Sequence, residues 1–570
     1  MIRKMLRKYV NDMSGKDWLI LVIILIAALI YRIIFLTKMY SIGFDEVNYL
    51  KLAASGNING LNHVLHAYWS PLYPAAVALF SYIIPDYEIA GRFLAIICSI
   101  LLIVPLFFFI KKYYNKQIAF LTALLIAFYS FAVYFSVKAE AEFLYSFAGI
   151  LGICIGWKTI HEAKIMNALW VGMLFGLCYL ARPEGIGFLI TFSGAVVLVI
   201  LIRILNRKKI KSYILITLLA IFGFGVISSP YLLYLKKETG YWTISTKGTI
   251  NQQGAYYVMN KTEYEEHPFH SLSPDDKRLM EDEIYHQGNF VKNNEGKQVV
   301  KVKITGLIKK VAENIYELFS ESFTRVFPLP VLILFSLGLF GTLLDRKKIY
   351  LTLYLLSYVV FFWFILIPLF HITLRYFVPL LPIGLVWVAQ GAVNFKEWLN
   401  SILGKLTELR LKSNVINIIS IIITMSFILF GSVLPELGKH MKGNVNSNEE
   451  WAPAIEQKKA GLWLKRHSDV KAPVIMAYNH AVSFYAGNYQ IKESIEIPEN
   501  KIDRLLRYAR HRGVDYIVLD SRYRHHHPHI QHLYENKDVP DELELIYDDD
   551  MGNGIRTLVY KLLNVPADPA

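Results

Sequence analysis

The sequence predicts a polytopic α-helical membrane protein that ends in a small α/β domain. Apolar residues make up 54% of the 570 residues and the mean hydropathy is +0.36, both higher than in soluble globular proteins. Apolar runs of about 20 residues, the length that crosses a bilayer as a helix, recur as far as residue 434. Hydrophobicity then drops sharply, so the remainder of the chain is predicted to lie outside the membrane.

The apolar runs predict about eleven membrane spans. The first follows a basic N-terminus, but it is too long for a signal peptide and no small-residue cleavage site follows it, so we interpret it as an uncleaved anchor. All three cysteines fall inside predicted spans, which argues against a disulfide framework. The predicted spans are residues 17–37, 89–110, 117–135, 141–157, 166–181, 183–202, 212–235, 328–344, 350–370, 374–393 and 414–434.

The distribution of Lys and Arg predicts the orientation of these spans. Basic residues are sparse in alternate connections, and by the positive-inside rule this places the N-terminus in the cytoplasm and the C-terminus outside, across the plasma (inner) membrane. The net charge of +14 follows largely from this bias. It therefore indicates no nucleic-acid partner. The basic segments are residues 1–16, 111–117, 158–165, 203–211, 346–348 and 394–412.

Two outward segments interrupt the predicted membrane domain, residues 1–434. The first outer loop, residues 38–88, combines turn signals with aromatic and proline runs, which predicts short helices at the interface and, with its acidic pair, the catalytic loop. The second, residues 236–327, contains apolar residues at helical spacing from Ile304 to Phe319. This spacing predicts an amphipathic helix on the membrane surface, near the substrate.

The C-terminal segment, residues 435–570, is predicted to be an extracytoplasmic soluble α/β domain. Short buried strands are predicted at 474–477 and 516–520, and helices at 453–467 and 499–512.

Ionisable side chains gather at the outward ends of the predicted spans. They come from separate connections but share one side and one depth of the membrane. Such a mixture suits transfer from an anionic lipid carrier, because a carboxylate accepts the proton of an attacking hydroxyl and a cation neutralises the phosphate that leaves. The residues are Asp45, Glu46, Glu140, Glu142, Arg182, Glu184, His371 and Arg375.

Most of these residues also have a purely structural interpretation. The acidic pair of the first outer loop could cap an interfacial helix, and the two glutamates of the next outer loop could end a span in water. Arg182 could anchor a lipid headgroup, and Arg375 could extend to a lipid phosphate.

Several short motifs occur in a fixed order between roughly residues 15 and 395. In this order and topology they resemble the GT-C class of membrane glycosyltransferases, in particular its protein O-mannosyltransferase-like and aminoarabinose-transferase-like branch. The motifs are Asp45-Glu46 with Tyr49, Tyr68-Trp69-Ser70-Pro71-Leu72-Tyr73-Pro74, Gly91-Arg92, Glu140 with Glu142, Ala181-Arg182-Pro183-Glu184-Gly185, and Arg375-Tyr376 with Pro379 and Pro382.

The resemblance implies that Asp45 is the catalytic base, with Glu46 beside it. It also implies an acidic residue in the next, short outer loop, between the predicted spans 117–135 and 141–157. For this residue we choose Glu140, with Glu142 as the alternate. This chain departs from the family pattern there, because it has Glu rather than Asp at both positions.

The resemblance further implies a site for the phosphate of a lipid donor. We expect Arg375 to meet this phosphate, with Tyr376 beside it, Arg182 second and Arg92 third. Some members of the class bind a divalent metal near the site. Here His371 and the first-loop glutamate could contribute ligands, but no spacing of His, Asp or Glu requires a metal.

The predicted function is inverting transfer of a sugar from a polyprenyl-phosphate carrier to a lipid, protein or glycan acceptor outside the cell. A nucleotide sugar is not expected as donor, because the site faces out and no Gly-rich phosphate loop is found on the cytoplasmic side. One alternative is an oligosaccharide ligase that uses a pyrophosphate-linked glycan. An alternative of another class is a transporter or flippase for a lipid-linked glycan, which would need charges near the bilayer midplane.

A histidine-rich tract from His525 to His532 resembles a metal-binding sequence. We favour a solvated surface loop instead.

Overall fold

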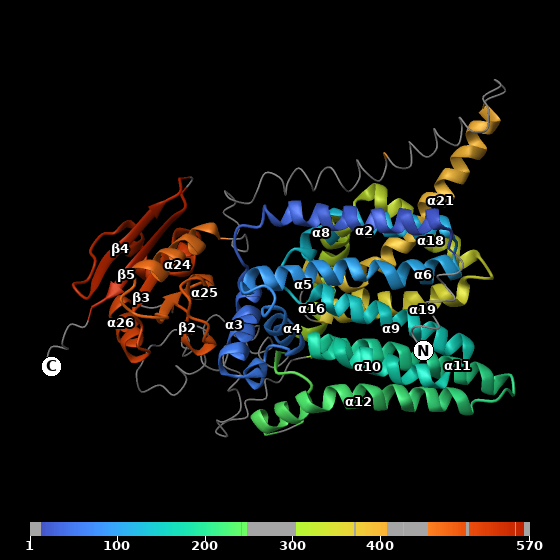
Figure 1. The fold of residues 1–570 in the computed structure, drawn as a ribbon, viewed down its shortest axis with the longest axis horizontal. Helices are drawn as coiled ribbons and strands as arrows, with labels where there is room; N and C mark the ends of the chain where they lie inside the picture. The colour runs from blue at the N-terminus through green and yellow to red at the C-terminus, as the bar shows by residue number, and fades with distance from the viewer. Residues whose placement is uncertain are drawn as a thin grey trace. The chain divides into compact units, whose positions relative to one another are not determined.

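The computed structural model describes residues 13–240, 242–247, 304–369, 372–406, 426, 454–497, 501–552 and 554–563 (Figure 1). Two compact units can be distinguished by their internal contacts. The helical unit comprises Met1–Lys38, Arg92–Ser229 and Val302–Lys442. The loop–sheet unit comprises Met39–Gly91, Pro230–Lys301 and Gly443–Ala570.

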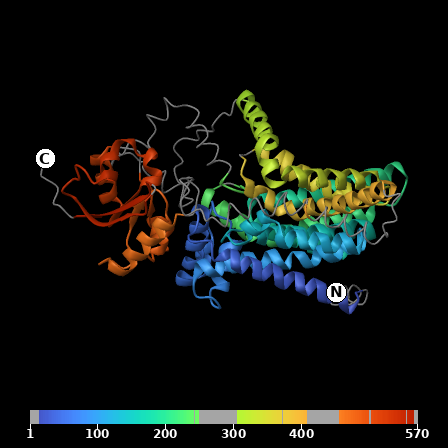
Figure 2. The ribbon, with the colours of Figure 1, turned by 90° about the horizontal axis from the view of Figure 1, so that it is seen from above.

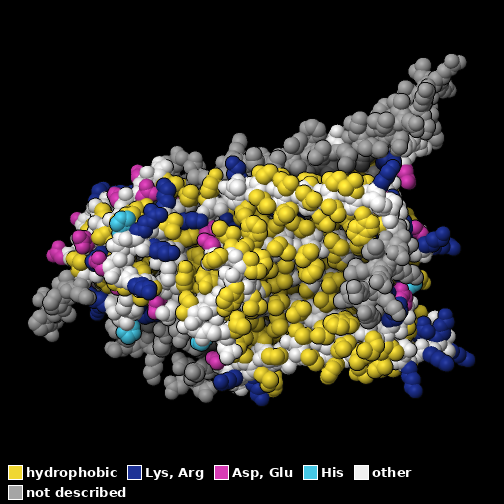
Figure 3. Space-filling view, in the orientation of Figure 1, with side chains coloured by type: hydrophobic (Ala, Val, Ile, Leu, Met, Phe, Trp, Pro, Cys, Tyr) yellow, Lys and Arg dark blue, Asp and Glu magenta, His cyan; other side chains and the backbone are white. Residues whose placement is uncertain are grey.

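Membrane-spanning helices confirm the predicted polytopic α-helical class. Within the described residues, seven helical stretches are long and apolar enough to cross a bilayer, or up to nine if each of two bent pairs is one span. Hydrophobic side chains cover the broad face of these helices (Figure 3). The seven stretches contain α2 (Gly15–Leu36), α5 and α6 (Tyr87–Leu101 and Ile103–Tyr113), α9 (Glu142–Glu162), α11 (Ile186–Leu205), α12 (Lys211–Thr239), α19 and α20 (Ile349–Val359 and Ile367–Leu369) and α21 (Leu381–Leu406).

Two predicted spans are in neither these seven stretches nor the two bent pairs. The prediction at 166–181 corresponds to α10 (Ile165–Ala181), an apolar helix of 17 residues that is shorter than any of the seven stretches. The prediction at 414–434 lies outside the described residues apart from residue 426.

The predicted span 117–135 is broken in the structure. It consists of α7 (Lys116–Phe128) and α8 (Ser130–Ser136), which meet at an angle of 55°. Arg32 of α2, which is completely buried, explains how the break is accommodated. Its guanidinium donates to the carbonyl oxygens of Ile126 (3.1 Å) and Ala127 (2.9 Å) in the last turn of α7. Carbonyls at a helix end lack intrahelical donors, so this charge inside a span has a structural role.

The predicted amphipathic helix is present as α16 (Ile304–Glu317), followed by η4 (Leu318–Ser322) and α17 (Phe323–Val326). This helical stretch turns by 98° into α18 (Leu329–Leu344), and Figure 2 shows α16, in yellow-green, at a steep angle to the bundled helices. Ile308 and Phe319 are exposed, whereas Leu318 is buried. The placement of α16 on a membrane surface stays a prediction.

The first outer loop folds as short helices within the loop–sheet unit. They are α3 (Phe44–Asn59), η1 (Leu61–Val64) and α4 (Leu72–Phe80). Helix α3 is mostly buried along its length, so the loop is a packed element rather than a solvated connection.

The C-terminal segment forms the predicted α/β domain, with a sheet of order β2-β1-β3-β5-β4. Strands β1 to β3 are parallel, and β5 runs antiparallel to β3 and β4. Alternate residues of β3 face α26 on one side and α24 with α25 on the other, as expected for a sheet covered on both faces. The elements are α24 (Ile455–His467), β1 (Ile475–Ala477), α25 (Ala481–Tyr485), β2 (Ser494–Ile495), α26 (Ile502–His511), β3 (Tyr516–Asp520), β4 (Leu543–Asp550) and β5 (Arg556–Leu562).

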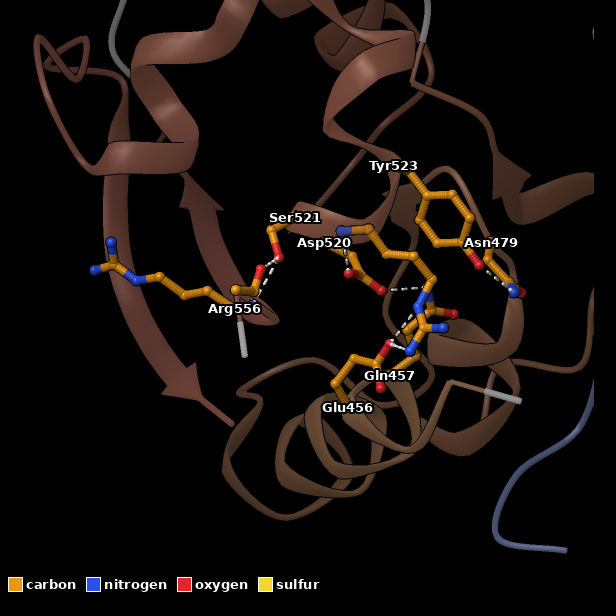
Figure 4. Close-up of polar contacts among 9 residues, drawn as sticks. Glu456, Gln457, Asn479, Asp520, Ser521, Tyr523 and Arg556 are labelled. Atoms are coloured by element: carbon orange, nitrogen blue, oxygen red, sulfur yellow. Dashed lines mark hydrogen bonds and ion pairs between the residues drawn. The ribbon is translucent and has the colours of Figure 1, made fainter. Parts of the chain in front are cut away.

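A buried polar cluster lies where β3 ends (Figure 4). Arg522 donates through Nε to Oε1 of Glu456 (2.9 Å), and its Nη2 forms an ion pair with the same oxygen at 2.7 Å. Gln457 donates to Oδ2 of Asp520 (2.9 Å), whose other oxygen accepts the backbone N–H of Arg522 (2.9 Å). Burial, together with the nearby Glu456, raises the pKa of Asp520 to about 7. The cluster joins the start of α24 to the carboxyl end of β3.

The histidine-rich tract is only partly solvated. His527 is buried and its Nδ1 lies 2.7 Å from the hydroxyl oxygen of Tyr534, while His526 stacks on Tyr478 with ring centroids 4.6 Å apart. Among the described residues, no group of three or more His, Cys, Asp or Glu is arranged to hold a metal ion.

The buried His527 predicts a pH-dependent stability. Burial lowers its pKa to about 4 in the folded protein from 6.5, so the unfolded state binds more protons between these values. This contribution, at most about 3 kcal/mol, is present above pH 6.5 and is lost as the pH falls towards 4. We expect the melting temperature of the full chain to fall less over this range in His527→Asn than in the wild type. His529→Asn, at an exposed position of the same tract, should follow the wild type, and parallel curves for all three proteins would refute the prediction.

Candidate active site

In the helical unit, Arg182 binds two of the predicted acidic residues. Its Nη1 pairs with Oε1 of Glu142, at the start of α9, and its Nη2 lies 3.2 Å from Oε1 of Glu184. Arg182 and Glu142 are 7% and 2% exposed. A buried ion pair of this kind needs its partner, because either charge alone would be costly in a poorly hydrated site.

The local sequence explains the position of Arg182. It ends α10 with an extended backbone, as expected for a residue before proline, and Pro183 opens the short helix η2 (Pro183–Gly185). A Cβ at Gly185 would lie 2.3 Å from the backbone of Cys178 and Tyr179. Only glycine therefore allows this turn to fold back closely enough on α10 to present Arg182 to Glu142.

Tyr376 joins both predicted phosphate-binding arginines. The guanidinium carbon of Arg182 lies 5.1 Å from the centroid of its ring, and that of Arg375 lies 5.6 Å away. Both distances suit cation–π contact. Arg375 and Tyr376 belong to η6 (Leu374–Leu380), and this helix is tied to α9 because Ser146 donates to the carbonyl oxygen of Pro379 (2.9 Å). The structure thus groups Arg182, Arg375 and Tyr376.

Glu140 and Arg92 lie in the same unit. Glu140 is 6% exposed, and its Oε1 lies 3.7 Å from Nζ of Lys138. The other carboxylate oxygens of Glu140 and Glu142 have no hydrogen-bond partner among the described residues. Arg92, in α5, is 3% exposed. Buried polar atoms of this kind favour a polar site over a span end open to water.

In the loop–sheet unit, Asp45 and Glu46 occupy the first turn of α3 but differ in role. Oε2 of Glu46 accepts the backbone N–H of Gly43 (2.6 Å), and Glu46 is 1% exposed. Glu46 therefore caps the helix. Asp45 is half-buried, and the N-terminus of a helix favours its negative charge.

One turn further along α3, Tyr49 begins an aromatic cluster. Its ring centroid lies 5.2 Å from Trp69 and 5.3 Å from Tyr73, and Asp45 and Tyr49 share a face by their spacing. Lys247 lies over Trp69 at 4.7 Å and over Tyr68 at 5.0 Å. Sequence analysis missed Lys247, because a lone lysine in a polar turn carries no signal of this contact.

The expected metal ligands are not assembled by the described residues. His371 lies outside them, and Glu46 is engaged in capping α3. A divalent metal stays a prediction for this site.

Comparison with solved structures shows which fold this is. The chain is similar to the oligosaccharyltransferase AglB from Archaeoglobus fulgidus in complex with an inhibitory peptide and a dolichol-phosphate, with a TM-score of 0.59 and 11% identity over 98% of this chain and 75% of that chain. It is also similar to ArnT from Cupriavidus metallidurans bound to undecaprenyl phosphate, with a TM-score of 0.52 and 11% identity over 97% of this chain and 99% of that chain. The chain has the GT-C fold of membrane glycosyltransferases.

The GT-C fold that the motif resemblance implies is thus confirmed. Residues 67–246 also match the family model described as dolichyl-phosphate-mannose-protein mannosyltransferase. The match begins after Asp45 and Glu46 and includes Glu140, Glu142 and Arg182. No curated protein matches the chain significantly.

Proposed function

We propose that this GT-C protein is an inverting glycosyltransferase that moves a sugar from a polyprenyl-phosphate carrier to an acceptor outside the plasma membrane. The observation that carries the proposal is the similarity to ArnT bound to undecaprenyl phosphate, which extends over nearly the full length of both chains. The mannosyltransferase family match supports the same class of chemistry.

In the proposed reaction, Asp45 takes the proton of an acceptor hydroxyl or amine as that group attacks the anomeric carbon. The new bond forms on the face opposite the donor phosphate, and the bond between the anomeric carbon and the phosphate oxygen breaks. The polyprenyl phosphate leaves with the electron pair, and the configuration inverts. Glu46, by contrast, accepts the backbone N–H of Gly43 at the start of α3, so we assign it a structural role.

We assign the donor phosphate to Arg375 first and to Arg182 and Arg92 after it. Arg182 already binds Glu142 and Glu184, so most of its charge is compensated. Tyr376 orients both Arg182 and Arg375 through its ring. Glu142 and Glu184 then act by holding Arg182, and Glu140 remains a candidate second carboxylate.

An oligosaccharide ligase is the second candidate, because the similarity to AglB covers 98% of this chain. The deciding experiment offers wild-type membranes a labelled polyprenyl-monophosphate sugar and, separately, a pyrophosphate-linked oligosaccharide. Covalent transfer from the monophosphate donor is expected. Transfer from the pyrophosphate donor alone would favour the ligase, and movement of the lipid across the bilayer without transfer would favour a flippase.

A further inference from the structure

Helix α3 is anchored to the C-terminal domain through a buried lysine. Lys51 is completely buried, and its Nζ donates to Oγ of Ser483 (2.7 Å) and to Oγ of Ser494. Ser483 lies in α25 and Ser494 begins β2. Lysine is rarely buried to this extent unless its head group is paired. The hydroxyl groups of the C-terminal domain thus provide contacts that allow Lys51 of α3 to be buried.

Burial at this contact lowers the pKa of Lys51 to about 7, against a smaller opposing effect of Glu493. A depressed lysine pKa is the expected result of excluding water from the ammonium group.

A second anchor lies just before α3. The backbone N–H of Ile42 donates to the hydroxyl oxygen of Tyr485 (3.1 Å), and that hydroxyl donates to Oε2 of Glu88 (3.0 Å). Lys458 of α24 donates to the same oxygen of Glu88 (2.8 Å). Glu88 is 7% exposed and lies in the first turn of α5. One tyrosine hydroxyl of the C-terminal domain therefore connects the two ends of the first outer loop.

We propose that the C-terminal domain holds the catalytic carboxylate in place, with Tyr485 and Lys51 as positioning residues for Asp45. Asp45 lies between the two anchors, three residues after Ile42 and six before Lys51. At 1.5 Å per residue, Lys51 is about 9 Å along the helix from Asp45, so the anchors restrict both the start and the axis of α3. Misplacement of a reacting group by about 1 Å can cost roughly 100-fold in rate.

The catalytic consequence rests on the proposed function, whereas the anchoring itself rests on the contacts alone. The test uses full-length Tyr485→Phe and Lys51→Met, with Tyr560→Phe as the matched control. Tyr560 is a buried tyrosine whose hydroxyl donates to the carbonyl oxygen of Leu533 (2.7 Å) within the C-terminal domain. Two quantities are measured: transfer kinetics with the labelled polyprenyl-monophosphate sugar, and hydrogen exchange of the amides from Ile42 through α3.

In Tyr485→Phe we expect about fivefold faster exchange at Ile42 and the start of α3, the effect of losing one hydrogen bond. We expect kcat to fall at least as much while KM for the donor stays within about twofold, because the donor-binding residues are untouched. Lys51→Met should change exchange and kcat in the same direction. Tyr560→Phe should leave kcat and the exchange of α3 unchanged.

Unchanged exchange or unchanged kcat in both anchor variants would overturn the proposal. An equal loss of kcat in Tyr560→Phe would also overturn it, because the effect would then be general destabilisation. If the wild type transfers no sugar, the proposed function fails by itself. The exchange comparison then still decides whether the C-terminal domain anchors α3.

Discussion

Replacing Asp45 by Asn is expected to lower the rate of sugar transfer by about 10²- to 10⁴-fold, the range that a general base contributes. Asn has nearly the same volume and suits the first turn of α3, but its amide cannot take up the acceptor's proton. Because Asp45 is half-buried and does not carry the capping contact of Glu46, the folded yield should stay close to that of the wild type. The measurement is the initial rate of transfer, normalised to folded protein.

The matched control is Glu313→Gln, which removes a carboxylate that is 65% exposed on α16. This variant should keep the wild-type rate. A wild-type rate in Asp45→Asn would show that Asp45 is not the base and would shift the assignment to Glu140. Glu46→Gln would be less informative, since the loss of its contact with Gly43 affects the start of the helix itself.

Replacing Arg182 by Met is expected to destabilise the folded protein by about 3–5 kcal/mol, the cost of breaking a buried ion pair from one side. The variant removes the cation that Glu142 and Glu184 share and leaves the Glu142 carboxylate buried. A large drop in folded yield and in melting temperature should follow in detergent. The double variant Arg182→Met/Glu142→Gln should recover much of the loss, because the buried charge disappears as well.

This comparison also tests whether Arg182 binds the donor phosphate. A wild-type melting temperature with a raised KM for the lipid donor in Arg182→Met would contradict the structural role. Arg375→Gln provides the reference for a phosphate-binding defect, since Arg375 contacts Tyr376 beside Arg182.

Sequence analysis located most of the fold because the relevant signals are local. Helical spans follow from apolar length, and the strands of the C-terminal domain follow from short buried runs such as Tyr516–Asp520. The break between α7 and α8 was not predicted, because the donors for the carbonyl oxygens at the end of α7 come from Arg32 of α2, which is far away in the sequence. Lys247 was missed for a similar reason, since its aromatic partners are remote in sequence.

The sequence by itself determined the membrane class, the acidic pair of the first outer loop and the set of charged residues at the span ends. These depend on residue type and spacing, which are read directly along the chain. Capping by the acidic pair could be anticipated because it is local, and the structure assigned it to Glu46. Only the tertiary structure showed that Arg182 binds Glu142. It alone revealed that Lys51 and Ile42 are held by the C-terminal domain. Arg182 and Glu142 lie 40 positions apart and Lys51 and Ser483 lie 432 apart, yet each pair is in contact, so for these groups the fold decides which ones bind one another.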